Sequence, residues 1–253
     1  MNMNMNVYVD TGLCTGAEIL AATDDLWTRS VIGPSWTGPG RLLPGAVCYG
    51  TGTPDEPDGS LTAVGEPHAV AKLVRRMLAD RAEPPYLVTV PRGTEVPGDV
   101  SATQDWELLA LHHAPPPQPA EDRVMPVGME ASTEITTLLT AASPEHSVRP
   151  GAPEAELWAG IRDPDGTLIA VGAMVCKPGT DLRSLASIAT APAHRGRGLA
   201  AAVTAWLAHR ALQRGPSCCV LALDSANHHA RRVYHRLGFR TVQEFTTVEF
   251  DTW

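Results

Sequence analysis

The sequence contains no apolar run long enough to cross a membrane and no secretory signal. A membrane-spanning helix needs about 20 consecutive apolar residues, and no segment of the 253-residue chain approaches that length. The first residues, MNMNMNVYVDTG, lack the basic and apolar regions of a signal peptide. With 43% hydrophobic and 19% charged residues, the composition is typical of a soluble globular protein. We therefore expect a cytoplasmic protein with no membrane partner and a flexible leader over residues 1–6.

Cysteine is scarce, and its spacing excludes the common zinc motifs. The chain has five cysteines, an odd number, and none belongs to a CxxC pair or has a histidine at metal-ligand spacing. We therefore expect reduced thiols and no bound metal. Cys218 and Cys219 are adjacent in an apolar stretch and are expected to be small core residues.

Positive charge is in deficit as well. The formal net charge is -8 at pH 7. A nucleic acid would require a basic face to neutralise its phosphates, so this balance argues against a nucleic-acid partner. It favours a small or cationic substrate instead.

Proline marks the clearest boundary along the chain. Four prolines lie within residues 115–119, where they would hold the chain in an extended form that helices and sheet interiors do not accept. This predicts a domain boundary near residue 115. The expected division is a leader over residues 1–6, an N-terminal lobe over 7–115, a linker over 116–122 and a C-terminal domain over 123–253.

The first lobe has the pattern of a mixed α and β structure. Apolar residues recur at helical spacing over residues 16–31 and 66–82, and the patterns over 85–90 and 105–114 predict strands. Residues 33–60 between these helices are so rich in glycine and proline that we expect an irregular connection. His112 and His113 fall at the end of the last strand, where alternation would direct one inward and one outward in a structural role.

The second half alternates strands and helices more regularly. Two strands over 156–176 surround a turn at Asp163–Gly166, and a helix over 134–143 precedes them. The remaining pattern predicts strands over 184–192, 217–224 and 239–250, and helices over 196–214 and 227–237. This order is typical of an α/β sandwich with a partly parallel sheet.

Two glycines flank an arginine in the stretch IATAPAHRGRGLAAAV, residues 188–203. The letters GRGLAA satisfy the dinucleotide-binding pattern G-x-G-x-x-[GA], and Asp224 ends the next predicted strand. That interpretation fails because a dinucleotide fold needs several further strand and helix units after the acidic residue. A phosphate-loop NTPase is excluded because no lysine followed by serine or threonine comes after the glycines.

The order of residues favours a pyrophosphate cradle over a turn in which Gly196 and Gly198 only permit a tight bend. A predicted strand is followed by Pro192 and then by R-x-x-G-x-A, beginning at Arg195, at the first turn of a helix. Glycines let backbone N–H groups approach a ligand closely, and a helix N-terminus offers unpaired donors and the positive end of a dipole. Arg195 and Arg197 add charge.

A second motif, NHHARRVYHRLGF, follows the next strand over residues 227–239. Asn227 and Tyr234 lie two helical turns apart on one face, with the small Ala230 between them, which leaves room for a ligand. Gly238 stands where a left-handed C-cap is expected. Taken separately, Asn227 has the position of an N-cap and Tyr234 that of an aromatic packed against the sheet.

Together the two motifs resemble those of the GCN5-related N-acetyltransferases, the GNAT superfamily. The segment at 195–200 is similar to the family motif Q/R-x-x-G-x-G/A, and that at 227–239 is similar to the second acyl-CoA motif. The resemblance covers residues 123–250 and is strongest to the FR47-like branch. It implies an α/β (α+β) fold with a GNAT-type mixed sheet flanked by helices in the C-terminal domain. It also implies a related, degenerate lobe over 7–115 without a CoA motif.

The resemblance implies an acyl-CoA-dependent N-acyltransferase whose co-substrate is acetyl-CoA and whose acceptor, a small-molecule amine, attacks the thioester directly in a ternary complex. A backbone N–H near Ile188 would polarise the acyl carbonyl. Asn227 would contact the pantetheine arm, and Tyr234 would act as the catalytic acid toward the departing thiolate. A homodimer is compatible with this assignment. The implied cofactor-binding residues are Ile188, Ala189, Thr190, Arg195, Gly196, Arg197, Gly198, Leu199, Ala200 and Asn227.

One departure from the family pattern concerns the general base. Family members often carry a glutamate on the strand before the cradle, whereas Ser184 stands at that place here. An alkylamine with a pKa of about 10.4 is mostly protonated at neutral pH, so a proton acceptor is useful, although a chain of waters could suffice. The departure leaves open an acyl-CoA-binding sensor or scaffold without turnover. The candidate bases are Asp181, Glu145, His146 and either His112 or His113.

Overall fold

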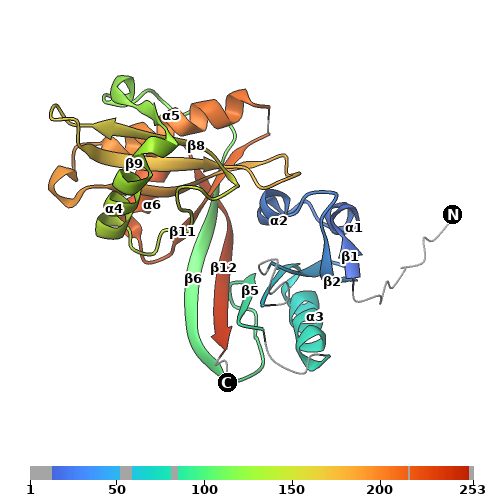
Figure 1. The fold of residues 1–253 in the computed structure, drawn as a ribbon. Coiled ribbons are helices and arrows are strands. Elements are labelled where there is room, and N and C mark those ends of the chain that lie inside the picture. Colours follow the sequence, from blue (N-terminus) through green and yellow to red (C-terminus); the bar gives the residue numbers. More distant parts are fainter. Residues whose placement is uncertain (1–12, 52–58, 81–84, 216, 251–253) are drawn as a thin grey trace. The chain divides into compact units, whose positions relative to one another are not determined.

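The computed structural model describes residues 13–51, 59–80, 85–215 and 217–250, so the predicted leader over residues 1–6 lies outside the described residues. The chain divides into two units (Figure 1). The N-terminal unit contains the described residues up to Glu107, together with Asp224–Ala226 and the residues from Gln243 onward. The C-terminal unit contains Leu108–Leu223 and Asn227–Val242.

This division differs from the predicted boundaries at residues 115 and 123. Strands β6 (Val100–Leu111) and β12 (Arg240–Phe250) each contribute residues to both units. Residues Phe245–Glu249 of β12 pair antiparallel with Leu87–Pro91, so the last described residues belong to the N-terminal unit. Proline indicates where regular structure stops, but it does not indicate which unit a neighbouring strand joins.

The segment predicted as a linker over 116–122 lies within the C-terminal unit. The Pro115 carbonyl oxygen is 3.1 Å from Nε2 of His209, and Oε1 of Glu121 is 2.8 Å from Nδ1 of the same ring. The Gln118 N–H donates to the other carboxylate oxygen of Glu121 at 3.0 Å. The proline-rich segment is therefore held against the helix that carries His209.

The N-terminal unit has strands in the order β1-β2-β3-β4-β5-β12-β6. Helix α3 packs on this sheet through Val70, Leu73, Val74 and Met77, whose helical spacing places them on one buried face. The predicted helix over 16–31 is two helices, because Asp25 caps the second one by accepting the Thr28 N–H at 2.7 Å. Besides β6 and β12, the elements of this unit are β1 (Leu13–Thr15), α1 (Gly16–Ala22), α2 (Leu26–Val31), β2 (Thr37–Leu43), β3 (Ala46–Gly50), β4 (Ser60–Gly65), α3 (Pro67–Ala79) and β5 (Leu87–Pro91).

The expectation of an irregular connection over residues 33–60 is wrong for most of its described part. Strands β2 and β3 form an antiparallel hairpin there, and every residue of β3 is buried. Gly45 turns the hairpin with φ of 83°, and a Cβ at Gly40 would lie 3.0 Å from Cys14 Cβ. These glycines serve the hairpin turn and close strand packing, two uses of glycine that density alone does not distinguish from a loop.

The C-terminal unit has a mixed sheet in the order β6-β11-β10-β9-β8-β7. Pairing is antiparallel from β7 to β10 and parallel between β10 and β11, which confirms the predicted fold class. The turn at Asp163–Gly166 also forms as predicted, with Gly166 at φ of 86°. The elements are β7 (Met125–Val127), α4 (Ser132–Ala142), β8 (Ala155–Arg162), β9 (Leu168–Val175), β10 (Arg183–Thr190), α5 (Leu199–Gln213), β11 (Cys219–Asp224) and α6 (His228–Arg236), with short 3-10 turns at Glu121–Arg123, Met129–Ala131 and Pro192–His194.

Helices cover both faces of this sheet (Figure 1). Val171, Ala173 and Val175 pack in a cluster with Leu139 of α4. The alternate residues Ala170 and Met174 pack in a cluster with α5 and α6, and this cluster also contains Cys219, which is fully buried as predicted. Within the described part of the chain, no helix is long and apolar enough to cross a membrane.

Candidate functional site

Strand β10 contains a bulge. Alternate residues that face helix α5 before the bulge face helix α4 after it. Ala186 lies opposite Ala173, but Ala189 lies opposite Val171, so β10 has one residue more than β9 between these two pairs. Ser187 within the bulge has φ of 52°, a left-handed conformation that is uncommon for a residue with a side chain. Leu185 therefore packs on the α5 face, whereas Ala189 packs on the α4 face.

Gly172 on β9 makes room for the residue that the bulge displaces. A Cβ at Gly172 would lie 3.1 Å from side-chain carbons of Ile188, Val203 and Leu207. Any larger residue would push Ile188 or helix α5 away from the sheet. Neither Gly172 nor the bulge was predicted, because a bulge has no composition that distinguishes it from a regular strand.

Strands β10 and β11 pair only over their first halves. The parallel register joins Arg183 to Cys219 and ends where Leu185 meets Leu221. Beyond that point Ala222 of β11 is exposed although its strand neighbours Leu221 and Leu223 are buried. The two strands thus separate next to the bulge and leave an open edge on each.

The open edge of β10 presents the backbone of Ile188 and Thr190. Ala191 donates its N–H to Ile169 at 2.9 Å, on the side of β9. Because successive N–H groups of a strand point to opposite edges, those of Ile188 and Thr190 point toward the side of β11. Both residues are among those that the family resemblance implies for cofactor binding.

Ser187 ties the bulge to the connection between α4 and β8. Its hydroxyl donates to the Val148 carbonyl at 2.8 Å and accepts the Val148 N–H at 3.0 Å, and both residues are buried. A second tie lies nearby, since Arg195 donates from Nη2 to the carbonyl of Ala142 at the end of α4, at 3.1 Å. The bulge, the glycine loop and the end of α4 are thus linked by hydrogen bonds.

The glycine loop opens helix α5 as the sequence predicts. Gly196 and Gly198 have φ of 75° and 74°, and a Cβ on either would meet nothing within 4 Å. Gly198 is the N-cap, and no side chain caps the helix. The first N–H groups of α5, including those of Leu199 and Ala200, therefore have no intrahelical acceptor and no side-chain cap.

The two arginines of the loop differ in what they contact. Arg195 donates from Nε to the Thr190 carbonyl at 3.4 Å and from Nη2 to Ala142, so its guanidinium braces the loop. Arg197 is exposed, and its Nη1 lies 3.0 Å from Nδ1 of His194. Of the two, Arg197 has the guanidinium that is more available to a ligand.

Asn227 is the N-cap of α6. This is the role that its position alone indicates, whereas the family resemblance implies contact with the pantetheine arm. The Asn227 side-chain oxygen accepts the Ala230 N–H at 3.0 Å, and the residue is exposed. The cap occupies the oxygen and fixes the side chain at the start of the helix. This start follows β11, the strand that separates from β10.

Tyr234 is buried on α6 with 9% of its surface exposed. Its ring packs against Phe239 in an edge-on arrangement with the ring centroids 6.0 Å apart. Burial raises the pKa of the phenol to about 12, because the phenolate would lose its hydration. The hydroxyl therefore stays protonated at neutral pH and can act as a proton donor.

The candidate bases do not gather around the bulge as one group. Ser184 lies on β10 before the bulge and is half-buried. His146 lies in the α4–β8 connection, with Nδ1 2.9 Å from the Ser143 carbonyl oxygen. His112 and His113 are both exposed beyond the end of β6, so the expected inward and outward alternation is wrong. Strand alternation no longer applies there because β6 ends at Leu111.

This arrangement can hold an extended ligand that ends in an anion. The open edge of β10 offers backbone hydrogen bonds, and the start of α5 offers N–H donors beside the Arg197 guanidinium. Together these groups suit a chain of amides that leads to a diphosphate.

The comparisons with known proteins agree with this geometry. Residues 132–239 match the model of the Acetyltransferase (GNAT) family. A search of the curated proteins finds no match. A solved structure of a GNAT-family protein from Novosphingobium aromaticivorans DSM 12444 is 23% identical, with 81% of this chain and 92% of that chain covered and a TM-score of 0.57.

Two further solved structures cover nearly the whole chain. A GCN5-related N-acetyltransferase from Kribbella flavida is 19% identical, with 94% of this chain and 96% of that chain covered and a TM-score of 0.56. A GNAT-family acetyltransferase from Colwellia psychrerythraea is 15% identical, with 94% and 99% covered and a TM-score of 0.57. The chain therefore has the fold of the GNAT acetyltransferases, and residues 132–239 are the part that matches the family model.

Proposed function

We propose that the protein transfers the acetyl group of acetyl-CoA to a primary amine of a small molecule, by direct attack in a ternary complex. The observation that carries this proposal is the open edge of β10, which leads from the bulge at Ser187 to the uncapped start of α5. One extended ligand can contact both the open edge of β10 and the start of α5. The match of residues 132–239 to the GNAT family supports the same chemistry.

Backbone groups do most of the binding in this proposal. The Ile188 carbonyl and the Thr190 N–H hydrogen-bond the amides of the pantetheine arm as an added strand would. Gly196, Gly198 and the first N–H groups of α5 surround the pyrophosphate, and Arg197 adds a charge-assisted hydrogen bond. A Cβ would project into the open space above either glycine, which is the space that the phosphates would fill. Ala189, Arg195, Leu199, Ala200 and Asn227 complete the binding segment by shaping the loop and the start of α6.

The chain supplies two groups to the reaction itself. When the amine nitrogen bonds to the acyl carbon, the Ile188 N–H stabilises the oxyanion that forms. When the carbon–sulfur bond breaks, the Tyr234 hydroxyl gives its proton to the thiolate. The extra proton of the amine leaves to water, since Ser184 stands where a carboxylate base would be expected. Solvent then returns a proton to the Tyr234 phenolate.

The net charge of -8 favours a cationic acceptor, as most amines are at neutral pH. We also propose that the N-terminal unit is a relative of the same fold, and that it is degenerate because it contains no R-x-x-G-x-G/A segment. We further propose that the protein belongs to the FR47-like branch. We propose a cytoplasmic location for it.

A second candidate function is an acyl-CoA-binding module without turnover, which Ser184 at the place of the base favours. Calorimetric titration with CoA, followed by detection of free thiol from acetyl-CoA with a panel of primary amines, distinguishes the two. We expect binding of CoA and release of thiol only when an acceptor is present. Tight binding without release for any amine favours the second candidate, and absence of binding contradicts both.

A further inference from the structure

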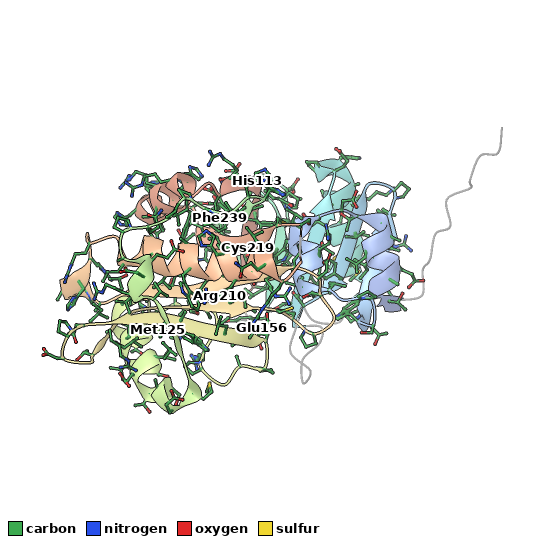
Figure 2. All side chains as sticks on the ribbon, turned by 90° about the horizontal axis from the view of Figure 1, so that it is seen from above. His113, Met125, Glu156, Arg210, Cys219 and Phe239 are labelled. Atoms are coloured by element: carbon green, nitrogen blue, oxygen red, sulfur yellow. The ribbon has the colours of Figure 1, made fainter. Side chains whose placement is uncertain are left out.

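A pocket of about 440 Å³ lies at the C-terminal end of helix α6. Its walls come from the end of β6, the residues after it, the last turn of α6 and the start of β12. Figure 2 shows His113, which lines it, and Met125 of the edge strand β7 on opposite sides of the C-terminal unit. We name this cavity the α6 end pocket. The lining residues are Ala110, Leu111, His112, His113, Ala114, Pro116, His235, Arg236, Leu237, Gly238 and Arg240.

The charged and titratable side chains of the α6 end pocket are all arginine or histidine. Among the described residues that line the pocket, Arg236 and Arg240 are joined by three histidines, and there is no aspartate or glutamate. In a chain with a net charge of -8, this local excess of cationic and N–H donor groups is unexpected from composition. Guanidinium and imidazole groups are the donors that proteins use for carboxylates and phosphates.

The end of a helix normally repels an anion, because its carbonyl groups carry partial negative charge. Here Arg240 offsets that effect. Its Nη1 donates to the carbonyls of His235 and Phe239, at 3.0 and 2.8 Å. Two carbonyl groups near the end of α6 are thus bonded to a cation, while Arg236, which also lines the pocket, is exposed.

The floor of the α6 end pocket is apolar and depends on a glycine. Leu111 and Leu237 are buried beneath it. Gly238 has φ of 100°, and a Cβ there would lie 3.2 Å from Cδ1 of Leu111. A side chain at this position would be strained and would fill the space above Leu111. The absence of a side chain at Gly238 therefore leaves space in the pocket above Leu111.

We propose that the α6 end pocket binds a small organic anion, whose carboxylate or phosphate meets Arg236 and Arg240 and whose apolar body lies in the space left open at Gly238. Its volume is within the range of about 300–1,000 Å³ of small-molecule pockets. The two arginines would bind the anionic group of such a ligand, and the space at Gly238 would accommodate its apolar part.

This pocket is separate from the glycine loop and does not depend on the proposed acetyl transfer. Asn227 starts α6 beside the open end of β11, and Arg236 ends the helix nine residues later. At about 1.5 Å per residue, the two ends lie roughly 13 Å apart. A ligand of the α6 end pocket therefore occupies a different position from one bound along β10.

The test is calorimetric titration of the full chain with phenyl phosphate and with benzoate, which separate a phosphate ligand from a carboxylate. Benzyl alcohol controls for apolar binding alone. The pocket variant is Arg236→Gln with Arg240→Gln, and the matched control is Arg232→Gln, an exposed arginine of the same helix that does not line the pocket. Arg197→Gln reports binding at the glycine loop instead.

We expect saturable binding of at least one anion, weakened about tenfold or more in the double variant and unchanged in R232Q and R197Q, because charge-assisted hydrogen bonds are lost only in the first. Since Arg240 also caps α6, thermal melting checks the double variant. If it is unfolded, Arg236→Glu alone decides, with the same loss expected. Binding that survives R236E, that is lost in R197Q, that benzyl alcohol matches, or that is absent from the wild-type chain overturns the proposal.

Discussion

Ser187 of β10 and Val148 of the α4–β8 connection exchange two hydrogen bonds across 39 residues of chain, with the serine hydroxyl donating at 2.8 Å and accepting at 3.0 Å. The exchange resembles one rung of a strand ladder in which a side chain replaces a backbone. It satisfies both buried backbone groups of Val148. It also explains how Ser187 is held at φ of 52°, since two bonds restrain the residue that forms the bulge.

Replacing Ser187 should destabilise the fold in a way that separates these two effects. Ser187→Ala removes both bonds and keeps the strained backbone, so we expect a loss of about 2 kcal/mol or more in the free energy of unfolding. Ser187→Gly removes the same bonds but relieves the strain and should be about 1 kcal/mol more stable than S187A. Urea unfolding measures both. Ser184→Ala, on the same strand before the bulge, is the control, and equal stability of S184A and S187A would contradict this account.

Gly198 tests the cradle. Gly198→Ala costs about 1 kcal/mol of stability through its positive φ, and its Cβ meets no protein atom within 4 Å but enters the space proposed for the pyrophosphate. We expect the affinity for CoA to fall about tenfold. Gly166→Ala is the matched control, because Gly166 has φ of 86° and equally open surroundings in a turn away from the loop. Equal CoA affinities of the two variants, measured by calorimetry, would place the phosphates elsewhere.

Tyr234 is expected to act in the reaction and to add little to cofactor affinity. Tyr234→Phe should lower kcat by about 100-fold, as the loss of a general acid does, while leaving the Kd for CoA unchanged. The fold should persist, because the buried ring is kept. Steady-state kinetics with calorimetry checks this, and a variant with wild-type kcat would rule out the tyrosine as the acid.

The same residue makes an alkaline stability prediction. The pKa of Tyr234 is raised from its usual value near 10 to about 12 by burial, so the unfolded chain loses this proton at lower pH than the folded one. Its contribution to stability is therefore complete below about pH 10 and is lost as the pH rises toward about 12. Relative to Y234F, the wild-type chain should lose about 1.4 kcal/mol between about pH 9 and pH 11. Urea unfolding at both pH values measures the difference, and parallel curves would show that the phenol is not buried.

The sequence predicts the site best where chemistry depends on local conformation. Gly198 must adopt a positive φ before a helix, and it does so. Asn227 caps the next helix, and the turn at Asp163–Gly166 forms as its residues indicate. Each of these features involves residues within a few positions of one another, so local patterns suffice.

Features that depend on partners far along the chain could not be predicted. Ser187 hydrogen-bonds to Val148, which is 39 residues away in the sequence. Strand β12 pairs with Leu87–Pro91, which lie far earlier in the chain. The proline-rich segment was expected to separate domains, whereas Glu121 and Pro115 contact His209 within one unit. Pairing of this kind is decided by packing, which a single sequence does not reveal.

The predictions for Gly198 and Tyr234 both depend on transfer of an acetyl group from acetyl-CoA to an amine. The most direct test incubates the protein with acetyl-CoA carrying an isotope-labelled acetyl group and a cell extract, and quantifies free thiol and labelled amines by mass spectrometry. We expect one labelled amine to form for each thiol released, with both strongly reduced in Y234F while CoA binding is retained. Thiol release without any labelled amine, or labelling that is unchanged in Y234F, would contradict this expectation.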